Sequence, residues 1–254
     1  MSTEGQDLQA HVAELQRRNA QLVEQTGHLQ HELEAFAYSV SHDLRAPLTA
    51  INGFADLLVR EYGPKLDGNA QRYLQRIREG TTRMAALMQE LLNLSRINQH
   101  ELFCQNLDLV PLVNAQVAAL RQADSNRQVA VAVPAQLPAY GDAKLLTAVL
   151  EKLLANAWKY TAKQPEARVQ VDCLPHSPPT YFVRDNGAGF NPEYTERLFR
   201  PFVRLHAESE FPSSGAGVGL ATVARIVHRH GGKVWAEGKP DAGATFFFTL
   251  PEKQ

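Results

Sequence analysis

His42 and Asp43 are the residues of this sequence whose types and spacing point most directly to covalent chemistry. A neutral imidazole near pH 7 keeps a lone pair on one ring nitrogen, which makes it a good nucleophile toward phosphorus. The neighbouring carboxylate could hold the other nitrogen, but adjacent helical residues point about 100° apart, so this contact is possible and not assured. The other eight histidines are expected to lack such a setting. Taken alone, His42 is more simply explained as an ordinary exposed helical histidine.

Asn156, Lys159 and Tyr160 form the first of three polar motifs that could together hold a nucleotide. Their spacing of i, i+3 and i+4 places all three on one face of a predicted helix. The amide oxygen could bind Mg²⁺, the ammonium could contact phosphate oxygens, and the phenol ring could cover a base. The alternative is an ordinary polar helix face.

Two glycine-containing motifs follow. Asp185 comes directly after a predicted strand, and its carboxylate could accept a hydrogen bond from an exocyclic amine. Gly187 and Gly189 would allow a close approach of the backbone. The other motif begins a predicted helix that runs to His230. Backbone amides at the start of this helix could bind a polyphosphate. Its residues are Gly215, Gly217, Gly219 and Leu220.

Each of the three motifs alone could be a polar face, a turn or a flexible loop, whereas their order and spacing together are specific. Between the two glycine motifs, residues 191–214 carry an aromatic pair, Phe199 and Phe202, in an otherwise polar segment with basic residues. Such a segment is typical of a lid that docks when a ligand binds. Arg204 could stabilise charge developing on a transferred group; a solvated cation is the alternative.

The first third of the chain predicts long helices. Heptad spacing of apolar residues predicts a parallel dimeric coiled coil over residues 8–34, with a lone amphipathic helix as the alternative. The helix continues over residues 35–60, although Pro47 lacks the N–H that would bond the carbonyl of Asp43 and should bend or loosen it. A turn then leads to a second helix that ends near residue 98. Two such hairpins would bury their apolar stripes together in a dimeric four-helix bundle.

After the hairpin, short strands and helices alternate, which predicts a two-layer α/β sandwich. Helices are expected over residues 110–123 and 142–160, the second with Asp142 as its N-cap. The expected strands are residues 107–109, 128–133, 168–174, 180–184, 233–237 and 244–250. The predicted fold class is therefore multidomain, α and α+β.

The composition argues against several other classes of protein. The 254 residues are 44% hydrophobic, enough for a sizeable core, and the net charge of −1 argues against an extended nucleic-acid surface. Cys104 and Cys173 are too few for a disulfide framework or a cysteine metal site, which suits a reducing compartment. No apolar run approaches the roughly 20 residues of a membrane-spanning helix. We therefore expect a soluble, cytoplasmic chain.

In combination, the motifs resemble the catalytic core of the sensor histidine kinases of two-component systems. The resemblance covers residues 35–250. It implies a dimerisation and histidine phosphotransfer hairpin at residues 35–98 and a Bergerat-type ATP-binding domain at 99–254. The heptad pattern makes the preceding residues 1–34 a coiled-coil signalling helix. The resemblance also implies a homodimer that uses ATP and Mg²⁺.

The activity implied by the resemblance is that of an autokinase, which phosphorylates His42 and passes the phosphoryl group to an aspartate of a separate response-regulator receiver domain. In this family Asp43 would serve as base and orient the ring, Asn156 would hold Mg²⁺, and Asp185 would read adenine. The rival functions are another Bergerat-fold ATPase and a catalytically silent nucleotide-binding scaffold. The 34 residues before the hairpin are too few for a folded sensor, so a separate protein signals to the chain or an upstream sensor is missing.

Lys152 is the first departure from the family's pattern. It stands one turn before Asn156, where the family usually has a second asparagine. A cation cannot bind Mg²⁺, so the affinity for the metal would be lowered unless Glu151 or water fills the place.

Ala46 is the second departure. It stands four residues after His42, where family members with strong phosphatase activity typically carry a threonine or asparagine that orients a water. We therefore expect weak phosphatase activity and dominant kinase activity, unless Arg45 or Asn52 holds the water.

Overall fold

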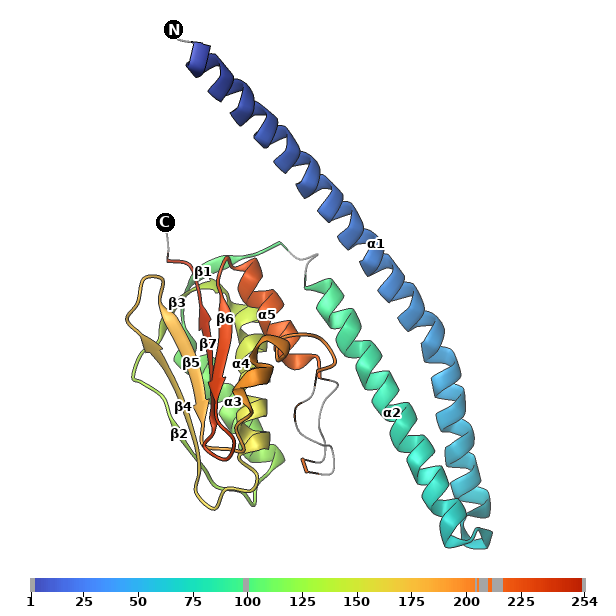
Figure 1. Cartoon of the computed structure of the whole chain (residues 1–254). Helices are drawn as coiled ribbons and strands as arrows, with labels where there is room; N and C mark the ends of the chain where they lie inside the picture. The colour runs from blue at the N-terminus through green and yellow to red at the C-terminus, as the bar shows by residue number, and fades with distance from the viewer. Residues whose placement is uncertain (1–2, 98–100, 204, 206–209, 212–216, 253–254) are drawn as a thin grey trace. The chain divides into compact units, whose positions relative to one another are not determined.

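The computed structural model of the chain describes residues 3–97, 101–203, 205, 210–211 and 217–252 (Figure 1). The chain forms two compact units, Met1–Met88 and Gln89–Gln254. Arg204 and Gly215, which were predicted to act at the nucleotide site, lie outside the described residues.

The first unit is a helical hairpin. Its first helix, α1 (Thr3–Tyr62), is followed by a short 3-10 turn, η1 (Gly63–Lys65), and by α2 (Gly68–Arg96), whose last turns belong to the second unit. α1 continues through Pro47 as a single helix (Figure 1). The hydrogen bond that proline removes at the carbonyl of Asp43 therefore does not end the helix.

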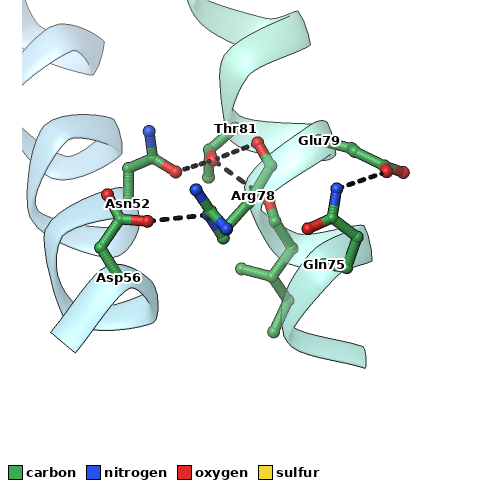
Figure 2. A network of polar contacts seen from close by, with 7 residues as sticks. Asn52, Asp56, Gln75, Arg78, Glu79 and Thr81 are labelled. Atoms are coloured by element: carbon green, nitrogen blue, oxygen red, sulfur yellow. Dashed lines mark hydrogen bonds and ion pairs between the residues drawn. The ribbon is translucent and has the colours of Figure 1, made fainter. Parts of the chain in front are cut away.

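Two polar contacts join α1 to α2 (Figure 2). Thr81 Oγ1 lies 3.0 Å from Asn52 Oδ1, and Arg78 Nε lies 2.7 Å from Asp56 Oδ1. Thr81 is buried, and its hydroxyl also lies 3.1 Å from the helix carbonyl of Ile77. A slip of one helix along the other would separate both pairs, so these contacts fix the register of the hairpin.

Thr81→Val should lower the free energy of unfolding of the hairpin by about 1 kcal/mol. Valine keeps the shape of the side chain but leaves Asn52 without this hydrogen-bond donor. Urea unfolding followed by circular dichroism measures the change. Thr82→Val, at the exposed neighbouring position, is the control and should change stability by no more than about 0.5 kcal/mol. Equal effects of the two substitutions would contradict the role given to Thr81.

The second unit is a two-layer α/β sandwich, as the alternation of elements predicts. Its elements are β1 (Cys104–Asp108), α3 (Leu109–Ala123), β2 (Val129–Ala132), β3 (Pro138–Asp142), α4 (Ala143–Tyr160), β4 (Ala167–Leu174), β5 (Thr180–Asp185), η2 (Pro192–Arg197), α5 (Gly219–Arg229), β6 (Val234–Gly238) and β7 (Ala244–Thr249). The larger sheet has the order β2-β4-β5-β7-β6, with β2 parallel to β4 and the other neighbours antiparallel. β1 and β3 form a separate antiparallel pair. Helices α3, α4 and α5 lie on one face of the larger sheet (Figure 1).

The core lies between these helices and the sheet. α4 contributes Leu153 and Ala157 and α5 contributes Ile226, while Val183 and Phe248 come from the strands; all five are buried. Because one face of α4 is committed to this core, its polar residues are left at the edge of the core, where a site can form.

Two elements differ from those the sequence predicts. The first strand ends at Asp108 and α3 begins at once, because the carboxylate of Asp108 caps the helix by accepting the N–H of Val110 at 3.0 Å. β3 has no counterpart among the predicted strands; it begins at Pro138 and is held by its pairing with β1. α5 begins at Gly219, the last glycine of the motif that was expected to open the helix.

The predicted start of α4 is confirmed. Asp142 is the N-cap of α4, and its carboxylate accepts the N–H of Leu145 at 3.0 Å. Cys104 and Cys173 are free thiols. Within the described ranges we find no helix with the length and hydrophobicity that crossing a membrane requires.

Candidate active site

His42 lies on an exposed face of α1. Its Nδ1 atom is 3.3 Å from Oδ1 of Asp43, so the contact that the sequence leaves open is present. The side chain of His42 is 70% exposed. A carboxylate at Nδ1 favours the tautomer that carries its proton there, which leaves the lone pair of Nε2 free to attack an incoming group.

The packing of α1 explains why this ring faces outward. Ser41 and Leu48, seven residues apart and therefore on one face of the helix, are both buried. His42 is turned about 100° from Ser41, and both His42 and Ala46 are exposed. A catalytic domain or a partner protein can therefore reach the ring.

His28, in the predicted coiled-coil segment of α1, also has a carboxylate neighbour. Its Nδ1 atom lies 3.6 Å from Oε1 of Glu32, and both side chains are exposed. A carboxylate neighbour alone therefore does not distinguish His42, because residues four apart on a helix are neighbours. His230 differs from both, since it is buried and its Nε2 accepts the N–H of Asp142 at 3.0 Å.

The second unit contains a cavity of about 690 Å³ beside α4. Six of the predicted nucleotide-site residues line it: Asn156, Lys159 and Tyr160 of α4, Gly217, and Gly219 and Leu220 at the start of α5. The helical spacing thus brings the amide, the ammonium and the phenol to one wall, as predicted. The N-terminus of α5 reaches the same cavity, which suits an anionic group.

The ring of Tyr160 is held between two neighbours. Lys159 Nζ lies 4.6 Å from its centroid, and the ring of Phe211 packs edge-on with the centroids 5.2 Å apart. Phe211 is buried and also lines the cavity. No local sequence signal indicates Phe211, because it is far from Tyr160 in the sequence.

Asp185, Gly187 and Gly189 do not line this cavity; their loop is fixed to the end of α4. Ala188 donates its N–H to the carbonyl of Tyr160 at 3.1 Å. A Cβ added at Gly187 would lie 2.5 Å from that same carbonyl oxygen. Gly189 has φ of +61°, and a Cβ there would lie 1.9 Å from the carbonyl oxygen of Lys239. The close approach for which these glycines are needed is therefore that of the chain's own backbone.

Asp185 is a buried carboxylate with an unusual pKa. Burial raises the pKa of Asp185 to about 6, and hydrogen bonds from the backbone N–H groups of Gly187 and Ala244 only partly offset this rise. The distance from the Gly187 nitrogen to Asp185 Oδ1 is 2.8 Å. A buried carboxylate that is costly to ionise is stabilised by a ligand that brings a further donor.

The predicted aromatic pair divides between two roles. Phe199 packs against the hydrophobic core. Phe202 is 54% exposed, has φ of +65° and donates its N–H to the carbonyl of Gly217 at 2.9 Å. Neither ring lines the cavity, whereas Leu198 and Val203 beside them do.

Lys152 lines the cavity, as its position one turn before Asn156 on the same face of α4 indicates. Glu90 lines it as well, although it was not assigned to the site. Glu90 has no local signal, because it comes from α2 and reaches the cavity only through the fold.

The side chains that line the cavity fit Mg²⁺ only if a bound ligand supplies further oxygen atoms to the metal. Among the residues described, no three His, Cys, Asp or Glu side chains form a cluster that could hold a metal ion. Asn156 brings an amide oxygen to the cavity wall. Mg²⁺ usually binds through one or two protein oxygens together with substrate phosphates and water, so this single donor is sufficient for a metal that arrives with a polyphosphate.

Two family models match the chain in succession. The model described as His Kinase A (phospho-acceptor) domain matches residues 32–100, and the model described as Histidine kinase-, DNA gyrase B-, and HSP90-like ATPase matches residues 141–254. The first range contains His42 and the hairpin. The second contains the cavity-lining part of α4 and the start of α5.

Relatives of this chain are similar to most of its length. Cyanobacterial phytochrome B of Nostoc sp. is 36% identical over 224 residues, which are 87% of this chain and 30% of that protein. Methanogenesis regulatory histidine kinase FilI of Methanothrix harundinacea is 34% identical over 248 residues, which are 96% of this chain and 26% of that protein. The chain thus spans less than a third of the length of either relative.

Among solved structures, the crystal structure of full-length ShkA in complex with AMPPNP is similar, with 27% sequence identity and a TM-score of 0.60. The match covers 85% of this chain and 45% of that one. The two successive family models, the histidine kinase relative and the similar solved structure lead to one conclusion: the chain belongs to the sensor histidine kinases.

Proposed function

We propose that this chain is an ATP-dependent autokinase that phosphorylates His42 and passes the phosphoryl group to an aspartate of a separate response-regulator receiver domain. The observation that carries the proposal is a single pair of features. The exposed imidazole of His42 has a carboxylate at Nδ1. The cavity is lined by the amide, ammonium and phenol residues of α4 and by the N-terminus of α5. The first feature supplies a nucleophile, and the second suits a nucleotide.

In the proposed reaction, Nε2 of His42 attacks the γ-phosphorus of ATP. The N–P bond forms while the bond from phosphorus to the bridging oxygen breaks, and ADP leaves with that electron pair. Asp43, at 3.3 Å from Nδ1, takes or shares the proton on that nitrogen and stabilises the positive charge that develops on the ring.

The roles at the nucleotide site follow from the chemistry of each group. Asn156 would hold Mg²⁺, which when bound supplies charge neutralisation at the phosphates. Lys159 and the N–H groups of Gly217 and Gly219 would contact phosphate oxygens, Tyr160 would cover the base, and Asp185 would accept a hydrogen bond from the adenine amine.

Four further predicted residues complete the proposed site. Phe199 and Phe202 would carry the lid, and Leu198 and Val203 would bring it to the nucleotide. Arg204 and Gly215, which lie outside the described residues, would contact the transferred group and the polyphosphate.

Labelling with γ-labelled ATP and Mg²⁺ tests the proposed function. A histidine kinase becomes labelled with phosphate that is lost in acid and kept in alkali, because the phosphoramidate N–P bond is acid-labile. A Bergerat-fold ATPase releases labelled phosphate without labelling the chain, and a silent scaffold does neither. Either of these two results would overturn the proposal.

The chain should form a homodimer through its hairpin. Large apolar side chains are exposed on both helices of the hairpin, among them Leu44, Ile51, Phe54 and Leu58 of α1 and Tyr73, Ile77 and Met84 of α2. A hairpin cannot bury such a stripe alone, whereas two hairpins can in a four-helix bundle. Sedimentation at micromolar concentration should give twice the mass of the chain. A Phe54→Glu variant should shift the equilibrium toward monomer, and a wild-type monomer would contradict the proposal.

Ala46→Thr should increase removal of phosphate from a phosphorylated receiver at least about tenfold. One contact that positions a water is worth a few kcal/mol in the transition state, and alanine offers none. The rival group Asn52 is already bonded to Thr81. The measurement uses a receiver phosphorylated by this chain and then freed of ADP, and Ala50→Thr, one turn further on, is the control. Rapid dephosphorylation by the wild type without ADP would contradict the inference.

A further inference from the structure

Lys152 occupies an unusual place in the nucleotide cavity. It lies one turn before Asn156 on α4, and both residues line the cavity. Its Nζ atom is 3.3 Å from Oε1 of Glu90 and 3.3 Å from Oε1 of Glu151. The side chain is only 26% exposed. A cation is therefore held inside the site by two carboxylates.

The stem of Lys152 lies over the start of α5. A Cβ added at Gly219 would lie 3.7 Å from Lys152 Cδ and 3.9 Å from Cβ of the same lysine. Gly219 begins α5 and lines the same cavity, so the ammonium stands beside the helix terminus at which phosphates are expected.

The charges around Lys152 are unbalanced. Burial would lower the pKa of Lys152, but Glu90 and Glu151 outweigh it and raise the pKa above its ordinary value. The lysine is therefore charged throughout the neutral range. One ammonium between two carboxylates leaves a net negative charge, which would repel an arriving polyphosphate. That repulsion is relieved if the flexible lysine turns from Glu90 to the phosphates.

We propose that Lys152 Nζ binds the polyphosphate of the nucleotide in exchange for Glu90, and that this contact supports ATP binding in the absence of a divalent cation. The inference rests on the proposed function, because it places ATP in this cavity. At the position where the family usually has asparagine, this chain would thus use the positive charge of a lysine. That charge would neutralise part of the negative charge of the phosphates, which Mg²⁺ otherwise neutralises.

A structural ion pair is the competing interpretation. In that case Lys152 stays with Glu90 and holds the last turns of α2 against α4, whether or not nucleotide is bound. Loss of the lysine would then lower stability without changing the affinity for ATP relative to that for adenosine. The two interpretations therefore differ in whether substitution of Lys152 changes the affinity for ATP more than the affinity for adenosine.

Calorimetric titration of the full chain with ATP and with adenosine, both in EDTA, tests the proposal. Lys152→Met should weaken ATP binding about tenfold and leave adenosine binding unchanged, because only ATP carries the phosphates. Lys144→Met removes a charge from an exposed position on the same helix that does not line the cavity, and it should change neither affinity. With Mg²⁺ present, the loss in Lys152→Met should be smaller than in EDTA. Equal ATP affinities of wild type and Lys152→Met in EDTA would overturn the proposal.

Glu90→Gln provides the opposite test. Removal of the competing carboxylate should strengthen ATP binding in EDTA by about threefold, whereas a structural ion pair predicts no gain. Glu101→Gln, at an exposed position away from the cavity, is its control. Weaker or unchanged ATP binding in Glu90→Gln would count against the exchange. If the wild type bound neither ATP nor adenosine, the proposed function itself would fail, a result distinct from adenosine binding without a Lys152 effect.

Discussion

His42→Gln should abolish transfer of the labelled γ-phosphoryl group from ATP to this chain. Glutamine keeps a polar side chain of similar reach, but it has no ring nitrogen with a free lone pair, so the N–P bond cannot form. ATP binding should be unchanged, because the residues that line the nucleotide cavity lie between Glu90 and Leu220 and do not include His42. Labelling with Mg²⁺ and γ-labelled ATP measures the first effect, and calorimetry measures the second.

His28→Gln is the matched control for this experiment. His28 also lies on α1, is exposed and has a carboxylate 3.6 Å from its Nδ1 atom. Labelling of His28→Gln should remain at the wild-type level, since a carboxylate neighbour alone does not present a histidine to ATP. Label that persists in His42→Gln, or disappears in His28→Gln, would show that the phosphoacceptor has been assigned to the wrong residue.

Features set by spacing along one helix could be predicted from the sequence. Asn156, Lys159 and Tyr160 share a wall of the cavity because residues three and four apart on a helix are neighbours. Asp142 caps α4 because a short polar side chain before an amphipathic run satisfies free N–H groups. The same rule places Lys152 beside Asn156. In each case the relevant distance is local, so residue types at a fixed separation determine it.

Features that depend on distant segments could not be predicted in this way. Glu90 meets Lys152 only after α2 and α4 have come together, and the ring of Phe211 meets that of Tyr160 although the two residues are far apart in the sequence. β3 forms because its residues pair with β1, although its own composition is a weak strand signal. The heptad pattern of residues 8–34 is consistent with the long helix α1, and the second helix of the predicted coiled coil stays a prediction.

Asp185→Asn should weaken the binding of adenosine and of ATP by about a hundredfold. Oδ1 of Asp185 accepts the N–H of Gly187 at 2.8 Å, and the N–H of Ala244 donates to the same carboxyl group. An asparagine that keeps these bonds with its single oxygen presents an NH₂ group to the adenine amine, and two donors repel each other. Calorimetry with adenosine measures this loss.

The binding of adenosine by the wild type should also depend on pH through Asp185. Since burial raises the pKa of this carboxyl to about 6, the ionised form that accepts the amine becomes scarce below that pH. The affinity should therefore fall about tenfold for each pH unit below pH 6 and be constant above about pH 7. Adenosine is the suitable ligand, because it has no phosphate that titrates in this range. A constant affinity from about pH 7.5 to about pH 5 would contradict the role of Asp185.

The same substitution should stabilise the second unit in the absence of nucleotide. The pKa of Asp185 is about 6 in the folded chain against an ordinary value of 3.8, so ionisation opposes folding. The free energy of unfolding therefore falls as the pH rises from about 4 to about 6 and stays low above that range. Asparagine carries no charge, so at pH 7.5 the gain should be up to about 3 kcal/mol, at 1.36 kcal/mol per pKa unit. The gain should shrink as the pH is lowered toward 4.

Asp142→Asn is the control, for which the expected change in the free energy of unfolding has the opposite sign. Asp142 is also buried, and burial would raise its pKa, but hydrogen bonds from the N–H groups of Leu145, Phe103 and Lys144 outweigh burial and lower the pKa below its ordinary value. Ionised Asp142 therefore favours folding above its unfolded pKa, and its loss should destabilise the unit at pH 7.5.

Trp158 and Trp235, the two tryptophans of the chain, both lie in the second unit, so tryptophan fluorescence in urea follows its unfolding. If Asp185→Asn destabilised the unit as Asp142→Asn is expected to do, the claim that ionised Asp185 lowers the free energy of unfolding would be wrong.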